Sequence, residues 1–194
     1  GPHQIVQRAH GLVHRSEPVP CVHPVEVDVV GLQAAQRLLA RRHDGLARGA
    51  APVRVADAVL MRLTDAIEEG RAPAIDDDFV AVARGILLDD ALSPAFRAQA
   101  LRLPDEGFIG EQRVVVDPEA VRAARRMLMG ELGRRLAADW QRIYAEHVTP
   151  GPYSPAPGPA GRRALRNLAL AYLVEGQVPG AVELAEQHLA ASKM

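Results

Sequence analysis

The segment from Asp117 to Ile143 constrains the fold of this chain more than any other. Asp117-Pro118-Glu119 places a capping residue, a proline at the first helical position and an acid in the first turn, which together mark a helix start. Apolar residues then recur every three or four positions over about thirty residues: Val121, Ala124, Leu128, Leu132, Leu136, Trp140 and Ile143. The pattern predicts one long amphipathic helix.

The same spacing begins at Val29 and predicts two helices before residue 71. We expect the first to end near Gly45 or Gly49. Pro52 can open the second at its first turn, and Gly70 is expected to close it. The apolar stripe of the second is formed by Val55, Val59, Leu60, Leu63 and Ile67.

Further helices are predicted after Asp76-Asp77-Asp78, after Ser93-Pro94 and around Phe108. Three acids before an apolar run indicate an N-cap and first-turn charges that face the helix dipole. A cation site is the less favoured interpretation, because the spacing of an EF-hand loop is absent. Beyond the proline-rich segment 149–160, two last helices are expected, with a break at Gly176.

About eight helices joined by short turns predict an all-α fold of antiparallel helix pairs, stacked as an α-solenoid or armadillo-like superhelix. A compact helical bundle is the alternative. Aromatic residues make up only 4% of the chain, which suits closely packed helices better than a β-sandwich. We assign the helical-repeat domain to residues 29–194. Residues 1–28, which contain Pro18, Pro20 and Pro24, are expected to form an irregular arm, either a linker or the tail of a preceding domain.

Composition excludes several classes of function. The net charge of −1 gives no bulk field that favours nucleic acid or an anionic membrane. Cys21 is the single cysteine, so no disulfide can form within the chain. No run of 18 apolar residues and no signal-peptide core is present. We therefore expect a cytoplasmic protein without membrane or nucleic-acid partners, and the oligomeric state stays open.

Four blocks of sequence, in this order and spacing, resemble the C-terminal helical region of bacterial zinc aminopeptidase N. They are LPDEGFIGEQ at 103–112, VDPEAV at 116–121, GPYSP at 151–155 and GRRALRNLALAYL at 161–173. The resemblance covers residues 90–194 closely and residues 18–89 loosely. It implies an all-helical, armadillo-like domain that encloses the active-site chamber of a peptidase and restricts the access of peptides.

The resemblance also implies the partners: the catalytic domain of the same enzyme and peptide substrates. The zinc motif His-Glu-x-x-His and the substrate-binding Gly-x-Met-x-Asn stretch of the family are missing here. No catalytic residue is therefore carried over, and zinc is expected in the parent enzyme but no cofactor in this chain. The alternative is a stand-alone helical-repeat module that binds a partner protein and has no enzymatic activity.

Reactive groups outside the resemblance favour structural interpretations. His10 and His14, with Glu17 nearby, could hold zinc if the segment were helical, but Gly11 stands where a metallopeptidase has its general base. We interpret them as linker histidines. Cys21 would need a base placed in space to act as a nucleophile.

The candidate site consists of Arg162, Arg163 and Arg166. All three lie at the start of a predicted helix, where the helix dipole disfavours positive charge. Arginine can bind a carboxylate through two hydrogen bonds, so we predict contact with the C-terminal carboxylate of a peptide. Ion pairs with acids on a neighbouring helix are the structural alternative.

Remaining polar residues of this region are predicted to be structural. We expect His147 to cap the helix that it ends, where a cationic ring would be favoured by the dipole. His188 is expected on the solvated surface beside Glu183 or Glu186. Asn167 is expected to satisfy a buried backbone group or to cap a neighbouring turn. In the last helix, Leu184 and Leu189 are predicted to be more exposed than helix periodicity implies.

Overall fold

The computed structural model describes residues 45–192, and every regular element among them is a helix. The predicted arm at 1–28, the first predicted helix, His10, His14 and Cys21 lie outside the described residues. The helices are α2 (Gly45–Glu68), α3 (Asp77–Leu88), α4 (Pro94–Ala100), α5 (Glu106–Glu111), α6 (Pro118–Arg135), α7 (Ala137–Glu146), α8 (Pro157–Glu175) and α9 (Ala181–Ser192).

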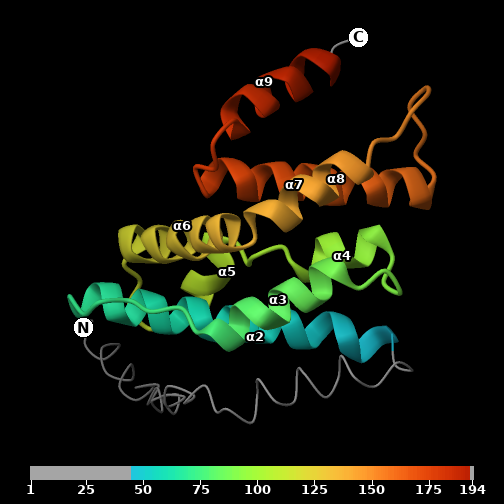
Figure 1. The fold of residues 1–194 in the computed structure, drawn as a ribbon. Helices are drawn as coiled ribbons and strands as arrows, with labels where there is room; N and C mark the ends of the chain where they lie inside the picture. The colour runs from blue at the N-terminus through green and yellow to red at the C-terminus, as the bar shows by residue number, and fades with distance from the viewer. Residues whose placement is uncertain (1–44, 193–194) are drawn as a thin grey trace, which may run out of the picture.

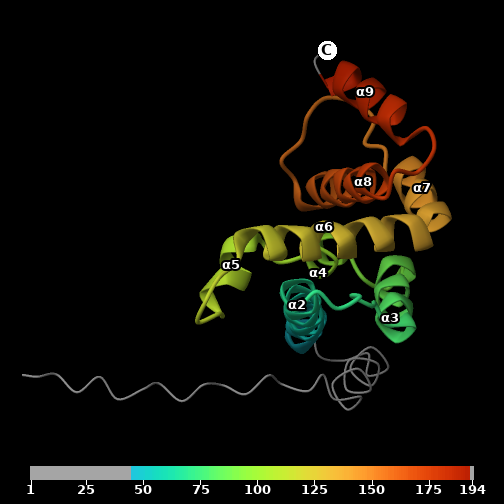
Figure 2. The same cartoon turned by 90° about the vertical axis from the view of Figure 1, so that its left-hand side faces the viewer.

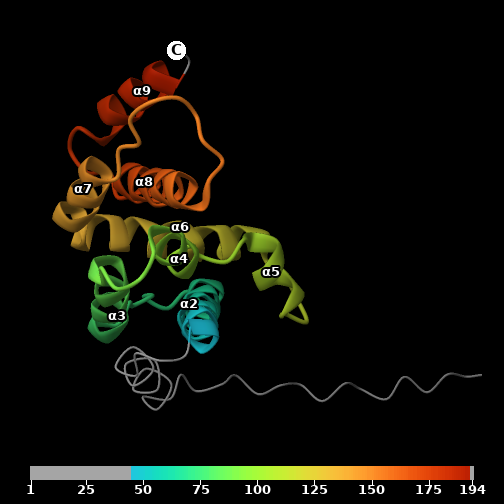
Figure 3. The same ribbon diagram turned by 90° about the vertical axis from the view of Figure 1, so that its right-hand side faces the viewer.

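The helices stack in successive layers (Figures 1 and 2). α2 and α3 form the first layer, α4 and α6 the second, and α7 and α8 the third, with α9 beyond them. α5 lies to one side, at the N-terminal end of α6, whereas α3 and α7 lie on the opposite side (Figures 2 and 3). This arrangement confirms the predicted all-α solenoid.

One continuous core runs through the stack, built mostly from aliphatic side chains. The predicted stripe of α6 and α7 is buried from Val121 to Ile143, as are Phe79, Ile86 and Leu87 of α3. Trp140 and Tyr172 stack nearly parallel, with ring centroids 4.4 Å apart and an angle of 7° between the rings. These two rings join α7 to α8 at the centre of the core.

The helix predicted from Asp117 to about residue 147 is in fact two helices, because the chain bends at Leu136. This residue has φ −109° and ψ 21°, which is not helical. The indole Nε1 of Trp140 donates a hydrogen bond to the carbonyl oxygen of Leu132 at 3.1 Å. The same carbonyl oxygen also accepts from the N–H of Leu136 at 3.1 Å, so the backbone bond is kept and the indole adds a second donor at the bend between α6 and α7.

The helix start predicted at Pro52 is also wrong, because α2 begins at Gly45 and continues through Pro52. Ala47, Ala50 and Ala51 are strong helix formers that favour this earlier start. The predicted end is confirmed. Gly70 has a φ of +66°, and the N–H of Arg71 bonds to the carbonyl of Ala66 at 2.8 Å, which is the pattern of a Schellman motif.

Two predicted helix starts are capped as expected. The carboxylate of Asp117 accepts from the N–H groups of Glu119 and Ala120, and the hydroxyl of Ser93 accepts from Phe96. The acidic run before α3 is different. Asp76 is at the N-cap position but makes no capping bond; its carboxylate instead pairs with Arg62 at 2.6 Å and ties the start of α3 to α2.

The last helix covers the stack only partly. Leu189 is 57% exposed, which confirms the prediction for this residue, whereas Leu184 is half-buried against the core. Within residues 45–192, no helix combines the length and the hydropathy that crossing a membrane requires.

Candidate functional site

The three predicted arginines lie in the first half of α8, and two of them stack on tyrosines. The guanidinium of Arg163 lies 4.6 Å from the ring centroid of Tyr153, and that of Arg166 lies 4.2 Å from the ring of Tyr144. Arg163 also donates from Nη2 to the carbonyl of Ser154 at 2.7 Å. Arg162 is exposed.

None of these arginines forms an ion pair within residues 45–192. The alternative that we considered, pairing with acids of a neighbouring helix, is therefore absent from the described part of the chain. Stacking on an aromatic ring orients a guanidinium but does not neutralise it. The positive charge of Arg163 and Arg166 remains available to an anion from outside.

Arg163 and Arg166 line a cavity of ≈ 640 Å³, which lies within the usual range of about 300–1,000 Å³ for small-molecule sites. We call it the arginine–tyrosine cavity; it lies between α7, α8 and α9. Its other lining residues are Tyr144, Val148, Thr149, Asn167, Leu184, Gln187, His188 and Ala191. No acidic residue is among them, so the cavity favours an anionic ligand.

His188 is half-buried in this cavity, which corrects its predicted place on the solvated surface. Its Nδ1 lies 3.0 Å from the hydroxyl of Tyr144. Burial lowers the pKa of His188 below its ordinary value, and the charge of Arg166 lowers it further. The ring is therefore neutral near pH 7, and the arginines carry the positive charge of the cavity.

Asn167 is exposed and lines the same cavity. Its side chain makes no hydrogen bond within residues 45–192, so the prediction that it satisfies a buried backbone group or caps a neighbouring turn is wrong. It follows Arg166 in α8, and its amide offers both hydrogen-bond donors and an acceptor. The helical turn that presents the arginines thus also presents a neutral polar group to the cavity.

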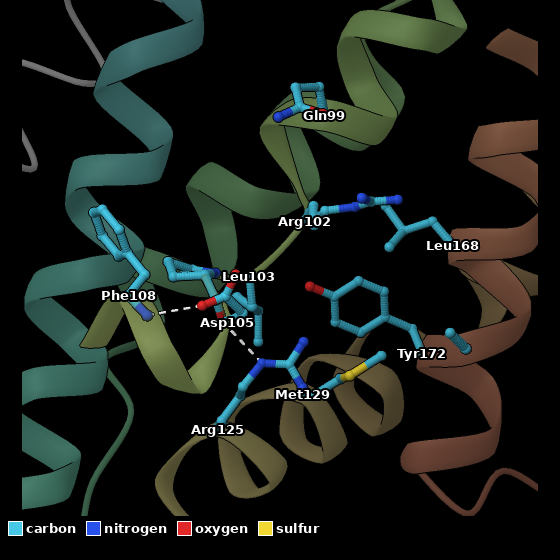
Figure 4. A pocket seen from close by; sticks show the side chains of 11 residues that line it. Gln99, Arg102, Leu103, Asp105, Phe108, Arg125, Met129, Leu168 and Tyr172 are labelled. Carbon is cyan, nitrogen blue, oxygen red and sulfur yellow. Dashed lines mark hydrogen bonds between the residues drawn. The ribbon is translucent and has the colours of Figure 1, made fainter. Parts of the chain in front are cut away.

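A second cavity, of ≈ 550 Å³, lies between α4, α5, α6 and α8. We call it the α4–α6 pocket. Figure 4 shows Arg102 and Arg125 in this pocket on either side of the Tyr172 ring. Arg102 follows α4, and Arg125 belongs to α6. The sequence offered no signal for this site, since the two arginines are 23 positions apart and no motif contains both.

The polar groups of the α4–α6 pocket differ in how many of their hydrogen bonds are already made within the protein. The hydroxyl of Tyr172 donates its proton to the carbonyl of Leu101 at 2.7 Å, so it has no proton left to donate to a ligand. Burial raises the pKa of Tyr172, and the nearby charge of Arg125 opposes this rise. Arg125 donates only from its Nε, to the carbonyl of Pro104 at 2.8 Å. Its terminal nitrogens, like the whole guanidinium of Arg102, have no partner among residues 45–192.

Comparison with known families identifies the family of this helical stack. Residues 33–194 match the family described as a domain of unknown function (DUF3458_C) with ARM repeats. The chain belongs to this family. The ARM-repeat domain thus spans most of the chain, in agreement with the layered helices.

Two curated relatives of the ARM-repeat domain confirm the predicted resemblance to the C-terminal helical domain of aminopeptidase N. Aminopeptidase N of Caulobacter vibrioides is 36% identical over 112 residues, which cover 57% of this chain and 12% of that protein. Aminopeptidase N of Escherichia coli is 31% identical over 94 residues, which cover 48% of this chain and 11% of that protein. The chain therefore matches only about an eighth of the length of these relatives.

The fold of the ARM-repeat domain is also found in a solved structure. It is similar to Legionella pneumophila aminopeptidase A, crystallised in complex with aspartic acid, with a TM-score of 0.62 and 19% identity. The match covers 78% of this chain and 18% of that one. At this identity the likeness concerns the fold alone.

The histidine that ends α7 has a structural role in the ARM-repeat domain, as predicted. His147 is the C-cap residue and is buried. Its Nδ1 lies 2.9 Å from the carbonyl of Ile143, and its Nε2 lies 3.3 Å from Nη2 of Arg97. Because a guanidinium can only donate, Nε2 is the acceptor from Arg97, and Nδ1 is the nitrogen that faces the carbonyl of Ile143. Within residues 45–192, no three His, Cys, Asp or Glu residues gather in a way that could hold a metal ion.

Proposed function

We propose that this ARM-repeat domain is a non-catalytic part of a zinc-dependent aminopeptidase N, in which it encloses the active-site chamber and restricts the access of peptides. Its kinship with aminopeptidase N supports the assignment. The observation that carries a role in substrate binding is the arginine–tyrosine cavity, where Arg163 and Arg166 lack carboxylate partners within the described residues. Zinc and the reacting groups would belong to the catalytic part of the enzyme.

The chemistry of the cavity suits the free carboxylate of a peptide. Arg166 uses its Nε on the carbonyl of Tyr144 at 3.1 Å, so its terminal nitrogens remain for a ligand. Arg163 uses one terminal nitrogen on Ser154. A carboxylate between them would receive charge-assisted hydrogen bonds from two guanidinium groups, and Arg162 would add charge at the exposed edge.

Tyrosine stacking gives the arginines a geometry that a peptide can use. A free arginine loses rotamer entropy when it binds a ligand, whereas a side chain already held against a ring loses less. Tyr144 holds Arg166 from α7, and Tyr153 holds Arg163 from the loop before α8. We therefore expect both rings to contribute to affinity without touching the substrate.

The test uses the enzyme encoded by the complete open reading frame that contains this chain. Two substrates are compared: trialanine, which has a free carboxylate, and alanyl-p-nitroanilide, which has none. Arg163→Gln and Arg166→Gln should each raise KM for trialanine about tenfold or more, the worth of one charge-assisted hydrogen bond. KM for the anilide should stay within about twofold.

Arg122→Gln is the matched control, because Arg122 is exposed on α6 and lines neither cavity. Equal effects of Arg166→Gln on both substrates would contradict the carboxylate contact. The isolated 194-residue chain should hydrolyse neither substrate with zinc present, and turnover by it would contradict the non-catalytic role.

A stand-alone module that binds another protein is the second candidate, and an exposed apolar loop favours it. Val114 is 92% exposed and Val115 is 79% exposed, between α5 and α6, and adjacent exposed apolar groups often mark a protein contact. An open reading frame without a His-Glu-x-x-His motif would favour this candidate over the peptidase. Cell fractionation of the producing bacterium would test the cytoplasmic location that we propose for either.

A further inference from the structure

The α4–α6 pocket contains two guanidinium groups that nothing in the described residues neutralises. Other arginines of this part of the chain are paired: Arg126 with Glu175, and Arg113 with Asp65 and Glu68. Arg102 and Arg125 have no carboxylate partner among residues 45–192. The one acid that lines the pocket, Asp105, accepts from the N–H of Phe108 at 2.7 Å and caps α5.

The backbone fixes where these charges lie. Arg125 is half-buried, and its bond from Nε to the carbonyl of Pro104 holds the guanidinium beside the α4–α5 connection. Its remaining nitrogens lie near the Tyr172 ring in Figure 4, and Arg102 enters from the other side of that ring. Both fork-shaped donors line the same pocket, and a guanidinium fork matches the two oxygens of a carboxylate.

Apart from the two arginines and Gln99, Asp105 and Tyr172, the residues that line the pocket are apolar. Leu103, Met129 and Leu168 line it together with Pro104, Phe108 and Ala171. Phe108 is 44% exposed although it is a large aromatic side chain. A free phosphate would leave this wall unused, and a metal cation would be repelled by the two arginines. The ligand that uses both features carries one carboxylate and an apolar group.

We propose that the α4–α6 pocket binds an amphipathic carboxylate, whose anionic group lies between Arg102 and Arg125 and whose apolar group packs on Leu103, Met129 and Leu168. The pocket is separate from the arginine–tyrosine cavity, and this site does not depend on the proposed peptidase role. The same chemistry occurs in a free N-acylated amino acid and at the C-terminal end of a peptide with an apolar last residue.

The experiment is an NMR titration of the 194-residue chain with three probes. N-acetyl-leucine carries the carboxylate and the apolar group, N-acetyl-leucinamide lacks only the charge, and acetyl-Ala-Ala-Leu carries both on a peptide. The methyl resonance of Met129 reports on the α4–α6 pocket, and the ring protons of His188 report on the arginine–tyrosine cavity. Binding at the two cavities is thereby read separately.

We expect N-acetyl-leucine to shift the Met129 methyl resonance with saturation, and the amide to bind about tenfold more weakly or not at all. Arg102→Gln should raise the dissociation constant read at Met129 by about tenfold. Arg102 is exposed, so this variant should fold. Arg122→Gln, on the surface of α6, should leave the constant unchanged.

Equal binding of the acid and the amide would overturn the proposal, as would an unchanged constant in Arg102→Gln or shifts at His188 without shifts at Met129. Saturable shifts at Met129 with the peptide acid alone would support the pocket and assign it to peptide ends. Equal affinity for N-acetyl-leucine and acetyl-Ala-Ala-Leu would support the proposal and show that the terminal leucine with its carboxylate is sufficient for binding.

Discussion

Gly133 of α6 and Gly176, the C-cap residue of α8, meet backbone to backbone. A Cβ atom on Gly133 would lie 2.9 Å from the Cα of Gly176 and would collide with the carbonyl oxygen of Tyr172. The two helices can approach this closely only because neither residue has a side chain. This contact sets the distance between the second and third layers of the stack.

Gly133→Ala should therefore destabilise the domain although alanine is the better helix former. The intrinsic gain is about 1 kcal/mol, but the new methyl group meets backbone atoms that cannot rotate away. We expect a net loss of roughly 2 kcal/mol in the free energy of unfolding, measured by urea denaturation.

Gly85→Ala is the control for helix propensity. Gly85 is exposed inside α3, and a Cβ there would have no atom within 4 Å. This variant should be more stable than the parent by about 0.5 to 1 kcal/mol. A stabilising Gly133→Ala would show that α6 and α8 can separate at little cost.

Gln177, directly after α8, has a strained backbone conformation. Its replacement by glycine should stabilise the domain. Its φ is +53°, the only positive value of a non-glycine residue among those described. The N–H of Val178 bonds to the carbonyl of Leu173 at 3.0 Å, a Schellman motif in which glycine is preferred at the turn position.

We expect Gln177→Gly to raise the free energy of unfolding by about 1 kcal/mol, seen as an increase of roughly 2 to 4 °C in Tm. Gln112→Gly is the comparison, since Gln112 ends α5 with a φ of −89°. That change relieves no strain and should lower Tm. A lower Tm for Gln177→Gly would mean that the side chain of Gln177 stabilises the domain by more than its backbone strain destabilises it.

The helices could be predicted from the sequence because their signals are local. The caps Asp117 and Ser93 lie within three residues of the N–H groups that they accept from. The bend at Leu136 could not be predicted in this way. The contacts found there involve a second helix: the indole of Trp140 donates to Leu132 while its ring is stacked on Tyr172 of α8.

The candidate site was predictable only in part for the same reason. Arg163 and Arg166 stand out because positive charge at a helix start is unfavourable. Their stacking partners come from elsewhere: Tyr144 from α7 and Tyr153 from the preceding loop. Arg102 and Arg125 line one pocket because of how the helices pack in three dimensions. No local sequence pattern predicts this.

Stability at high pH should depend on Tyr172. Burial raises the pKa of its hydroxyl above the ordinary value of 10, so the folded state favours the neutral phenol. A raised pKa in the folded state means that the stabilisation is complete below pH 10 and is lost as the pH rises above it. At pH 11, which is one unit above the pKa of tyrosine in the unfolded chain, the free energy of unfolding should be lower by roughly 1.4 kcal/mol.

Urea denaturation at pH 8 and pH 11 tests this dependence. Tyr172→Phe should be less stable than the parent at pH 8 by about 1 kcal/mol, because the carbonyl of Leu101 loses its donor. The difference should shrink or reverse at pH 11. Tyr153→Phe, at a tyrosine that is 79% exposed, should follow the parent at both values. Parallel curves for the parent and Tyr172→Phe would contradict the raised pKa.

The contact between Arg97 and His147 should be strongly coupled, because each is buried and satisfies the other. Arg97 is 4% exposed, and it donates to the carbonyl of Leu87 at 3.0 Å as well as to Nε2 of His147. This pair joins the end of α3 and α4 to the end of α7. Removing one partner leaves a buried polar group without its hydrogen bond.

His147→Leu and Arg97→Met should each destabilise the domain by about 2 kcal/mol or more. The double variant should lose less than the sum of the two, by about 1 to 2 kcal/mol, because it replaces the whole contact with apolar groups of similar size. A double-mutant cycle in urea measures this term. Additive effects would mean that Leu87 and Asp90 hold Arg97 without His147, and that the C-cap of α7 needs no guanidinium to keep the imidazole in place.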